Sequence, residues 1–371
     1  MNKLVIGNLL HRPLRTAISV VAVAIEVVMI LSIVAVMVGM VNNASTQRSG
    51  IGADIIVSPQ GSSFISSVSG APVPAKIADV LGKLPHVAVA SPAIAQFNME
   101  GGVETIWGID FASYNALKPF VFLEGGPFSA PNANEVIVDD LYAHAQPGRT
   151  LGATILLMHS HIPFRICGIV EHGKGGRVFL PIRVLGGLNG NPNNASVFYL
   201  KSDDLKNQEL IRSEIKATPG LSQYQVQTIQ EWMSLMTPDH LPGFNIALRV
   251  VIGIAVIVGF LVIFQSFYTA VLERTREIGI LKSMGASKLY IVNVVLREAL
   301  LIAVAGIILG ILLTEALKLG LSTRMPTFSF LLTNAWRVNA TVIALTGSLL
   351  GALYPAWKAA RKDPIDALAY E

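Results

Sequence analysis

The sequence predicts an α-helical membrane protein with four transmembrane helices and a large α+β extracytoplasmic domain of two lobes between the first and second helices. Three observations predict this fold class. Of the 371 residues, 52% are hydrophobic and only 14% are charged, whereas soluble proteins carry about 25% charged residues. Four apolar segments are long enough to cross a hydrocarbon core about 30 Å thick, which needs about 20 helical residues. Basic residues gather on one side of these segments.

The four segments differ in clarity but all qualify as spans. The first is too long for the apolar region of a signal peptide and lacks a convincing cleavage site, so we expect a retained anchor. Gly306-xxx-Gly310 and Gly347-xxx-Gly351 have the small-xxx-small spacing of helix contact faces. The predicted spans are residues 17–41, 245–272, 291–317 and 338–357.

Orientation follows from the lysines and arginines that flank the spans. The short loop 318–337 carries only Lys318, Arg324 and Arg337. The opposite side is richer in basic residues, so we expect residues 1–16, 273–290 and 358–371 in the cytoplasm and residues 42–244 outside. The basic residues on the expected cytoplasmic side are Lys3, Arg12, Arg15, Arg274, Arg276, Lys282, Lys288, Lys358, Arg361 and Lys362.

Residues 42–244 are numerous enough, at about 200, to bury a core of their own. Because Cys167 is the only cysteine, no intrachain disulfide supports this domain. A β-rich lobe, interpreted as an all-β insertion, is expected at about 130–190. A helix over 203–217 is expected to carry Leu205, Leu210, Ile211 and Ile215 on one stripe. Further elements are predicted as strands at 54–57, 103–109, 135–138, 154–158, 164–170, 177–180 and 196–200 and a helix at 75–84.

The loop after the second span is the most informative stretch. Glu273, Arg274, Arg276 and Glu277 form a charged helical turn that cannot enter the bilayer. An apolar side follows, made of Ile278, Ile280, Leu281 and Met284. Gly285 is expected to end the helix in a left-handed conformation, and Ser287 to begin the next helix. Such an amphipathic helix suits a docking partner, and the alternative is a solvated turn with snorkelling basic side chains.

Residues 273–287 read ERTREIGILKSMGAS, which resembles the ERTREIGILKAMGAS segment of MacB/FtsX-type permeases, the type VII ABC transporters. The tail from Pro355 to Leu368 resembles the family's terminal PAWRAARLDPIEAL pattern, and the span order is the MacB-type layout. A looser resemblance to the family's external β lobe runs from Glu135 to Val170. The resemblance implies that the loop is an ATPase-coupling helix. The residues assigned to it are Glu273, Arg274, Arg276, Glu277, Gly279, Lys282, Met284 and Gly285.

Further expectations follow from the resemblance. The sequence has no phosphate-cradling Gly-x-x-x-x-Gly-Lys-Ser/Thr, so the chain is expected to be non-catalytic and without a cofactor, with ATP and magnesium held by a separate ATPase. The implied assembly pairs two permeases, identical or paralogous, with two ABC ATPase subunits in a bacterial inner membrane. A periplasmic adaptor is compatible with the large domain, and nucleic acid is not an expected partner. The implied function is export or extraction of a substrate by mechanotransmission. The alternatives are an FtsX-like regulator and a membrane-anchored enzyme or receptor.

Three other features have more than one interpretation. Glu26 lies within the first span, where burying a carboxylate is costly and therefore suggests a function. Its side chain has three possible roles: it faces a dimer axis, it forms a hydrogen bond with Ser32, or it is protonated and only structural. For Arg297-Glu298, at the start of the third span, helix packing is the favoured role. His159-x-His161 has the spacing of two metal ligands on a strand, but a surface pair is favoured because no third ligand is evident.

Overall fold

The structure, a computed structural model, describes residues 7, 13–62, 72–98, 104–157, 162–235, 244–325 and 327–361. The chain divides into two compact units, which we call the helix bundle and the β domain. The helix bundle consists of Met1–Met40, Leu241–Thr323 and Ser329–Glu371. The β domain consists of Val41–His240 and Arg324–Phe328.

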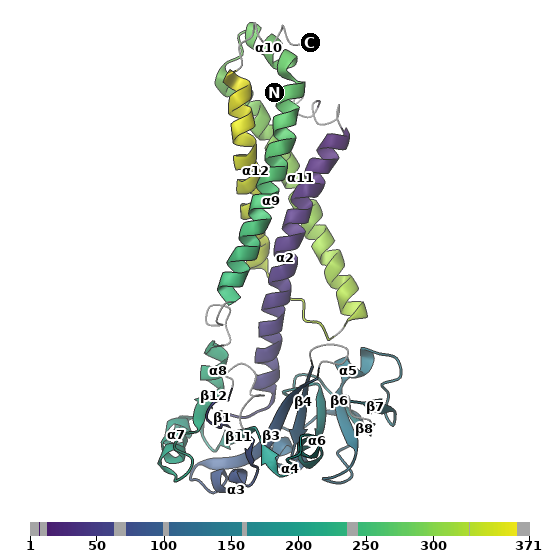
Figure 1. Cartoon of the computed structure of the whole chain (residues 1–371), viewed down its shortest axis with the longest axis vertical. Helices are drawn as coiled ribbons and strands as arrows, with labels where there is room; N and C mark the ends of the chain where they lie inside the picture. Colours follow the sequence, from purple (N-terminus) through teal and green to yellow (C-terminus); the bar gives the residue numbers. More distant parts are fainter. Residues whose placement is uncertain are drawn as a thin grey trace. The chain divides into compact units, whose positions relative to one another are not determined.

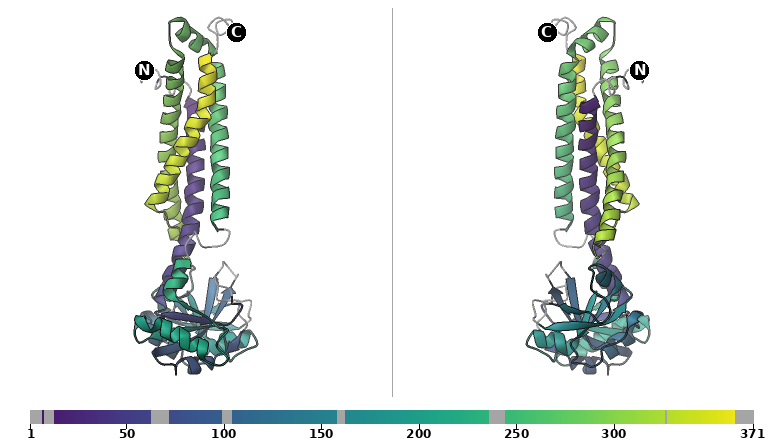
Figure 2. Two further views of the ribbon diagram at one scale, coloured as in Figure 1. Left: turned by 90° about the vertical axis from the view of Figure 1, so that its left-hand side faces the viewer. Right: turned by 90° about the vertical axis from the view of Figure 1, so that its right-hand side faces the viewer.

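Among the described residues, four helices are long and apolar enough to cross a membrane. They run side by side in the bundle (Figures 1 and 2). This confirms the prediction of four spans with a folded domain between the first and second. The helices are α2 (Pro13–Gly50), α9 (Phe244–Glu273), α11 (Lys288–Arg324) and α12 (Asn334–Arg361).

These helices extend beyond the apolar segments. Helix α2 continues through Asn42 and Gln47 to Gly50, and α11 and α12 take up much of the stretch 318–337 that was expected to be a loop. The reason is that hydrophobicity marks only the part of a helix that fits in hydrocarbon. Polar residues beyond that part continue the same backbone hydrogen bonding.

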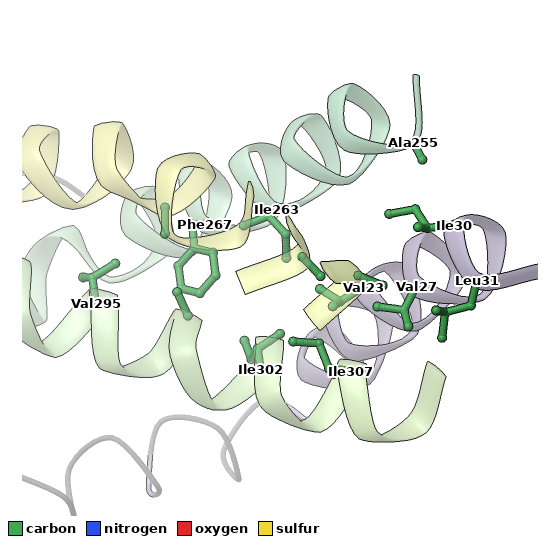
Figure 3. Packing of buried hydrophobic residues seen from close by; sticks show 14 of the residues in the cluster. Val23, Val27, Ile30, Leu31, Ala255, Ile263, Phe267, Val295, Ile302 and Ile307 are labelled. Atoms are coloured by element: carbon green, nitrogen blue, oxygen red, sulfur yellow. The ribbon is translucent and has the colours of Figure 1, made fainter. Parts of the chain in front are cut away.

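The core of the bundle consists mainly of aliphatic side chains from several helices, together with the ring of Phe267 (Figure 3). Val23, Val27 and Leu31 of α2 are fully buried there. The buried side of α12 is instead formed mainly by small residues, among them Ala344 and Ala352. Small residues let helices approach closely, and close packing is a main source of helix association in lipid.

Both glycine pairs lie on helix contact faces within the chain. A Cβ atom added at Gly306 would lie 2.6 Å from Cβ of Val23, and one added at Gly310 would lie 2.7 Å from Cβ of Val27. Helix α11 therefore packs on α2 through the first pair. In the second pair, a Cβ at Gly351 would lie 3.1 Å from Ile263 of α9. The predicted contact faces are confirmed.

The β domain is built on a mixed sheet of ten strands in the order β12-β1-β11-β3-β4-β9-β6-β8-β5, with β7 paired to β8. Within this sheet β4 pairs with β9, and β6 with β8, in parallel. A separate pair joins β2 (Val73–Pro74) to β10 (Asn194–Ala195). The strands of the large sheet are β1 (Ile55–Ser58), β3 (Val87–Asn98), β4 (Glu104–Ile109), β5 (Phe122–Gly125), β6 (Glu135–Asp139), β7 (Thr154–Leu156), β8 (Pro163–Val170), β9 (Val178–Pro181), β11 (Val197–Ser202) and β12 (Gln225–Thr228).

Two hydrophobic cores lie along this one sheet, which is how the structure realises the two lobes. One core contains Phe198 and Ile211, and the other contains Val136 and Phe164. The interpretation of residues 130–190 as all-β was wrong, because this stretch contains two short helices. The helices of the domain are α3 (Ile77–Leu81), α4 (Phe111–Leu117), α5 (Asp140–His144), α6 (Ile182–Leu188), the 3-10 turn η1 (Leu205–Asn207), α7 (Gln208–Ala217) and α8 (Ile229–Leu235).

The expected apolar stripe over 203–217 is half right. Ile211 and Ile215 are fully buried, but Leu205 and Leu210 are 60% and 53% exposed. Leu205 lies in the 3-10 turn that precedes α7. Because a 3-10 turn has about 3.0 residues per turn and an α-helix 3.6, the turn breaks the assumed register.

Lys174 is buried in the β domain next to aromatic rings. Its Nζ atom lies 4.8 Å from the ring centre of Phe120 and 5.6 Å from that of Tyr114, and among the described residues it has no hydrogen-bond partner. Burial, reinforced by the nearby charges of Lys118 and Lys201, lowers the pKa of Lys174 to about 8. The buried charge of this ammonium group therefore destabilises the folded domain.

The glycine contacts predict an effect on stability. Gly306→Ala or Gly310→Ala should lower the thermal midpoint of the protein in detergent, because overpacking a tight contact costs about 1–3 kcal/mol. Gly320→Ala is the matched control, since it lies on the same helix with nothing within 4 Å of its added Cβ. Equal midpoints for the three variants would contradict the contact.

Lys174 predicts a pH dependence. Between the lowered pKa of about 8 and the ordinary lysine pKa of 10.5, the unfolded chain binds more protons at this site than the folded chain. The contribution of Lys174 to the free energy of unfolding should therefore rise with pH across this window. Thermal unfolding of Lys174→Met, compared with the parent at several pH values, should show that this rise is lost. The control variant Lys83→Met, at an exposed lysine, should keep the rise of the free energy of unfolding with pH. If Lys174→Met keeps this rise as well, the effect does not come from Lys174.

Candidate functional site

The predicted coupling loop forms the short helix α10 (Thr275–Ser283), which follows α9 after Arg274. Its end has the predicted geometry. Gly285 is left-handed, with φ of +92°. The Gly285 N–H donates to the carbonyl of Lys282 at 3.0 Å, and the Ala286 N–H donates to that of Leu281 at 3.0 Å, which is the Schellman pattern. The Ser287 hydroxyl then accepts the N–H of Tyr290 at 3.2 Å and caps α11.

Helix α10 has an inner and an outer side. On the inner side Thr275 and Gly279 are buried, and Ile278 packs against a cluster that includes Ile291 and Ala359. The Lys282 ammonium donates to the carbonyl of Ala360 at 3.1 Å. These contacts fasten α10 to the adjoining ends of α11 and α12.

The outer side of α10 is exposed and mixed in character. Arg276 and Glu277 are exposed there, together with Ile280 at 45% and Met284 at 72%. The expected apolar side is therefore divided, since Ile278 points inward while Ile280 and Met284 point outward. Two exposed apolar side chains beside two charges, one helical turn apart, form a surface suited to a protein partner.

A buried carboxylate connects α10 to two other helices. Glu298 of α11 is buried, with its side chain 4% exposed. Its Oε2 accepts a hydrogen bond from Arg274 Nη1 at 3.1 Å, and its Oε1 lies 3.4 Å from Arg15 Nη2. Arg15, near the start of α2, also lies 3.6 Å from Glu273. The sequence indicated a packing role for Glu298 but did not predict these ion pairs. The only sequence signal for them was that Glu298 is expected at about the same depth in the membrane as Arg15 and Arg274.

A cavity of about 310 Å³ lies between α9, α10 and α11. Its walls are mostly apolar, with Phe267, Val294 and Ile278 among them, and Arg274 and Glu298 lie at its polar end. The cavity therefore borders the ion pairs and α10, whose Glu277 and Ile280 also line it.

Glu26 of α2 is buried inside the bundle. A side chain at Gly259 of α9 would overlap its carboxyl group, and a Cβ at Gly347 of α12 would lie 3.8 Å from Oε1. Among the described residues neither Glu26 oxygen has a hydrogen-bond partner, and the Ser32 hydroxyl is also without one. The hydrogen bond between Glu26 and Ser32, which the sequence left possible, is thus not formed. Glu26 faces helices of its own chain.

Within the described part of the chain, no group of three or more His, Cys, Asp or Glu residues could hold a metal ion. His159 and His161 lie outside the described residues, so the hypothesis of a histidine pair is not addressed.

Comparison with known families agrees with this geometry. Residues 16–218 match the MacB-like periplasmic core domain, and residues 249–364 match the FtsX-like permease C-terminal domain. The first match alone covers more than half of the chain.

The relatives are macrolide export ATP-binding/permease proteins called MacB. The protein from Shewanella sp. (strain W3-18-1) is 27% identical over 97% of this chain, and that from Escherichia coli (strain K12) is 26% identical over 78%. The chain spans 59% and 48% of the lengths of these two relatives.

Two solved structures align with about half of this chain. The periplasmic region of MacB from Actinobacillus actinomycetemcomitans aligns with 49% of this chain and 92% of its own, at 16% identity and a TM-score of 0.37. The extracellular domain of the transporter YknZ from Gram-positive bacteria aligns with 47% of this chain and 98% of its own, at 16% identity and a TM-score of 0.36. From the two matched family domains and the four spans, the chain belongs to the MacB/FtsX-type family of ABC transporter permeases.

Proposed function

We propose that this permease couples ATP hydrolysis by an ABC ATPase subunit to the movement of a substrate on the outer side of the inner membrane. The observation that carries the proposal is the two-sided nature of α10. Its inner side is fastened to the bundle, and its outer side exposes Ile280, Met284 and a pair of opposite charges. An element built in this way transmits force from a partner to the helices behind it.

The proposed orientation places α10 in the cytoplasm, where ATP is available. Arg15, Arg274, Lys288 and Arg361 belong to the helix ends on the α10 side of the bundle. An excess of lysine and arginine marks the cytoplasmic side of a membrane protein. With α10 inside, both termini would be cytoplasmic and the β domain extracytoplasmic.

The ATPase would receive α10 in a groove that offers an apolar pocket for Ile280 and Met284 and polar groups for Arg276 and Glu277. The names of the MacB relatives include an ATP-binding part. This supports an ABC ATPase as the partner of α10. A dimer of permeases with two ATPases is the proposed assembly.

The proposed mechanism is mechanotransmission. Closure of the ATPases would push α10, the ion pairs at Glu298 would pass the displacement to α2 and α11, and α2 would carry it into the β domain. The domain would act on a substrate or an adaptor protein at the outer leaflet. The relatives named as macrolide exporters support export as the outcome.

A second candidate is an FtsX-like regulator that moves an extracytoplasmic partner without transport. The match of residues 249–364 to the FtsX-like permease domain supports this alternative. ATP-dependent loss of a substrate from cells that produce the chain would decide for export. ATP-dependent activation of an extracytoplasmic enzyme without such loss would decide for regulation.

The partnership is tested by purification of the full chain from membranes in a mild detergent. An ABC ATPase subunit should accompany it. Ile280→Asp, Met284→Asp and Glu277→Ala should each weaken the association, and central apolar contacts in interfaces are worth about 2 kcal/mol or more. Leu210→Asp, at a similarly exposed leucine on α7, is the control and should leave it unchanged. If no ABC ATPase accompanies the parent chain, the proposal fails.

The ion pairs at Glu298 predict a non-additive pattern in thermal unfolding. Arg15→Gln/Arg274→Gln leaves a buried carboxylate without its partners and should destabilise the protein by about 3–5 kcal/mol. Adding Glu298→Gln to this double variant should restore part of the loss, because the unpaired charge is then gone. Arg297→Gln, whose side chain bonds to Asn293 within α11, is the control. A triple variant less stable than the double variant would contradict the arrangement.

A further inference from the structure

Arg48 occupies an unusual place in the last turn of α2, where that helix belongs to the β domain. The residue is 6% exposed. Its guanidinium carbon lies 4.8 Å from the ring centre of Trp232 and 5.6 Å from that of Trp107. Its Nη1 atom donates a hydrogen bond to the Tyr199 hydroxyl at 3.2 Å.

The three aromatic partners of Arg48 come from three different elements. Trp107 lies on β4 and Tyr199 on β11, both in the middle of the large sheet. Trp232 lies on α8, the last described helix of the domain before α9. One buried cation therefore joins the end of α2, the centre of the sheet and the segment through which the chain returns towards α9.

The surroundings of Arg48 keep the end of α2 in a fixed position. Ile51, just after the helix, is fully buried. A side chain at Gly50 would overlap the carbonyl of Gly173, and Gly52 has a φ of +80°, with an added Cβ 2.9 Å from the carbonyl of Leu117. The Trp107 and Tyr199 rings also contact each other, with centres 5.9 Å apart.

Helix α8 is held at its start by contacts that do not involve Arg48. The Glu231 N–H donates to the Thr228 hydroxyl at 3.1 Å, and Glu231 Oε2 accepts the Thr228 N–H at 2.9 Å, which forms a capping box. Arg212 of α7 pairs with Glu231 as well. Loss of the Arg48 contacts should therefore release the end of α2 from α8, while α8 itself stays folded.

We infer that Arg48 is a positioning residue that clamps the end of α2 to α8, so that the two chain segments bordering the domain move together. The mechanical consequence rests on the proposed function. A displacement of α2 would then reach the sheet through Trp107 and Tyr199 and α8 through Trp232. Without the clamp, α2 could shift against α8 and less of the displacement would reach the domain.

The chemistry of the clamp requires arginine. A guanidinium group is planar and delocalised, so it can lie against two indole rings and still donate a hydrogen bond in its own plane. A lysine ammonium is a compact, strongly hydrated point charge and cannot fill the space between two rings in this way. Arg48→Lys should therefore fail to replace arginine although the charge is kept.

The clamp is tested by the distance between α2 and α8 in the full chain. Thr46 and Gln230 are both exposed and would carry spin labels on introduced cysteines, with Cys167→Ser removing the native thiol. The parent should give a narrow distance distribution. Arg48→Lys, Arg48→Gln and Trp232→Ala should broaden it, and Trp232→Phe, which keeps a ring, should retain most of the narrow population. Arg149→Gln is the matched control, because Arg149 lies 3.7 Å over the Tyr142 ring in another part of the domain.

A second measurement reports on the mechanical role. In the complex with the ATPase, the change in the α2–α8 distance between nucleotide-free and ATP–vanadate states should be small in the parent, where the two helices move together, and about threefold or more larger in Arg48→Lys. The amount of ATPase that accompanies the chain should stay the same, since α10 is untouched. Distributions as narrow in Arg48→Lys and Arg48→Gln as in the parent would overturn the clamp. Absence of any ATPase from the parent would overturn the proposed function instead, while the distance measurement would still test Arg48.

Discussion

A buried carboxylate, Glu298 of α11, determines how one end of the helix bundle is assembled. A carboxylate with 4% side-chain exposure is tolerated only where cations and hydrogen bonds compensate its lost hydration. The cations are Arg15 and Arg274, which belong to α2 and to the junction of α9 with α10. Three separate helix ends must therefore meet at this charge. Any movement of the junction of α9 with α10 away from the bundle breaks charge-assisted hydrogen bonds, so this junction and the helices behind it are expected to move as one body.

Helix α2 carries an anchoring arginine near each end, and the two anchors differ in chemistry. Arg15 pairs with carboxylates, whereas Arg48 lies between indole rings and donates to a phenol. The first suits a membrane boundary, where arginine is common, and the second suits a packed aromatic core. A helix held at both ends can transmit displacement along its length, because its backbone hydrogen bonds make it stiff compared with a loop. This combination supports the mechanical role proposed for the protein.

Sequence patterns predicted the four spans and the C-terminal end of α10, because both depend on local chemistry such as apolar length and the left-handed Gly285. They did not predict β3, a central strand of the sheet, whose Pro92 is typical of edges. Strand β3 pairs with β4 only from Ala93 onward. Pro92 therefore lies opposite a partner strand, β11, on one side only, as a proline in an edge strand does. The contacts of Glu298 with Arg15 and of Arg48 with Tyr199 join residues far apart in sequence. No local pattern specifies such pairs, and only the folded arrangement of helices and strands brings them together.

The tight contacts of Gly306 and Gly310 with α2, and of Gly351 with α9, have a consequence for assembly. Motifs of this spacing are often taken as dimerisation signals, but here their grooves are already filled by side chains of the same polypeptide. The lipid-accessible flank of α9 instead presents branched aliphatic residues such as Ile246, Val250, Ile254 and Leu261. Two copies of the chain in contact along this flank would meet through bulky aliphatic side chains. They would not meet through a glycine-lined groove, which accepts only one packing geometry. The affinity between copies would then depend on the soluble parts of the assembly more than on recognition within the bilayer.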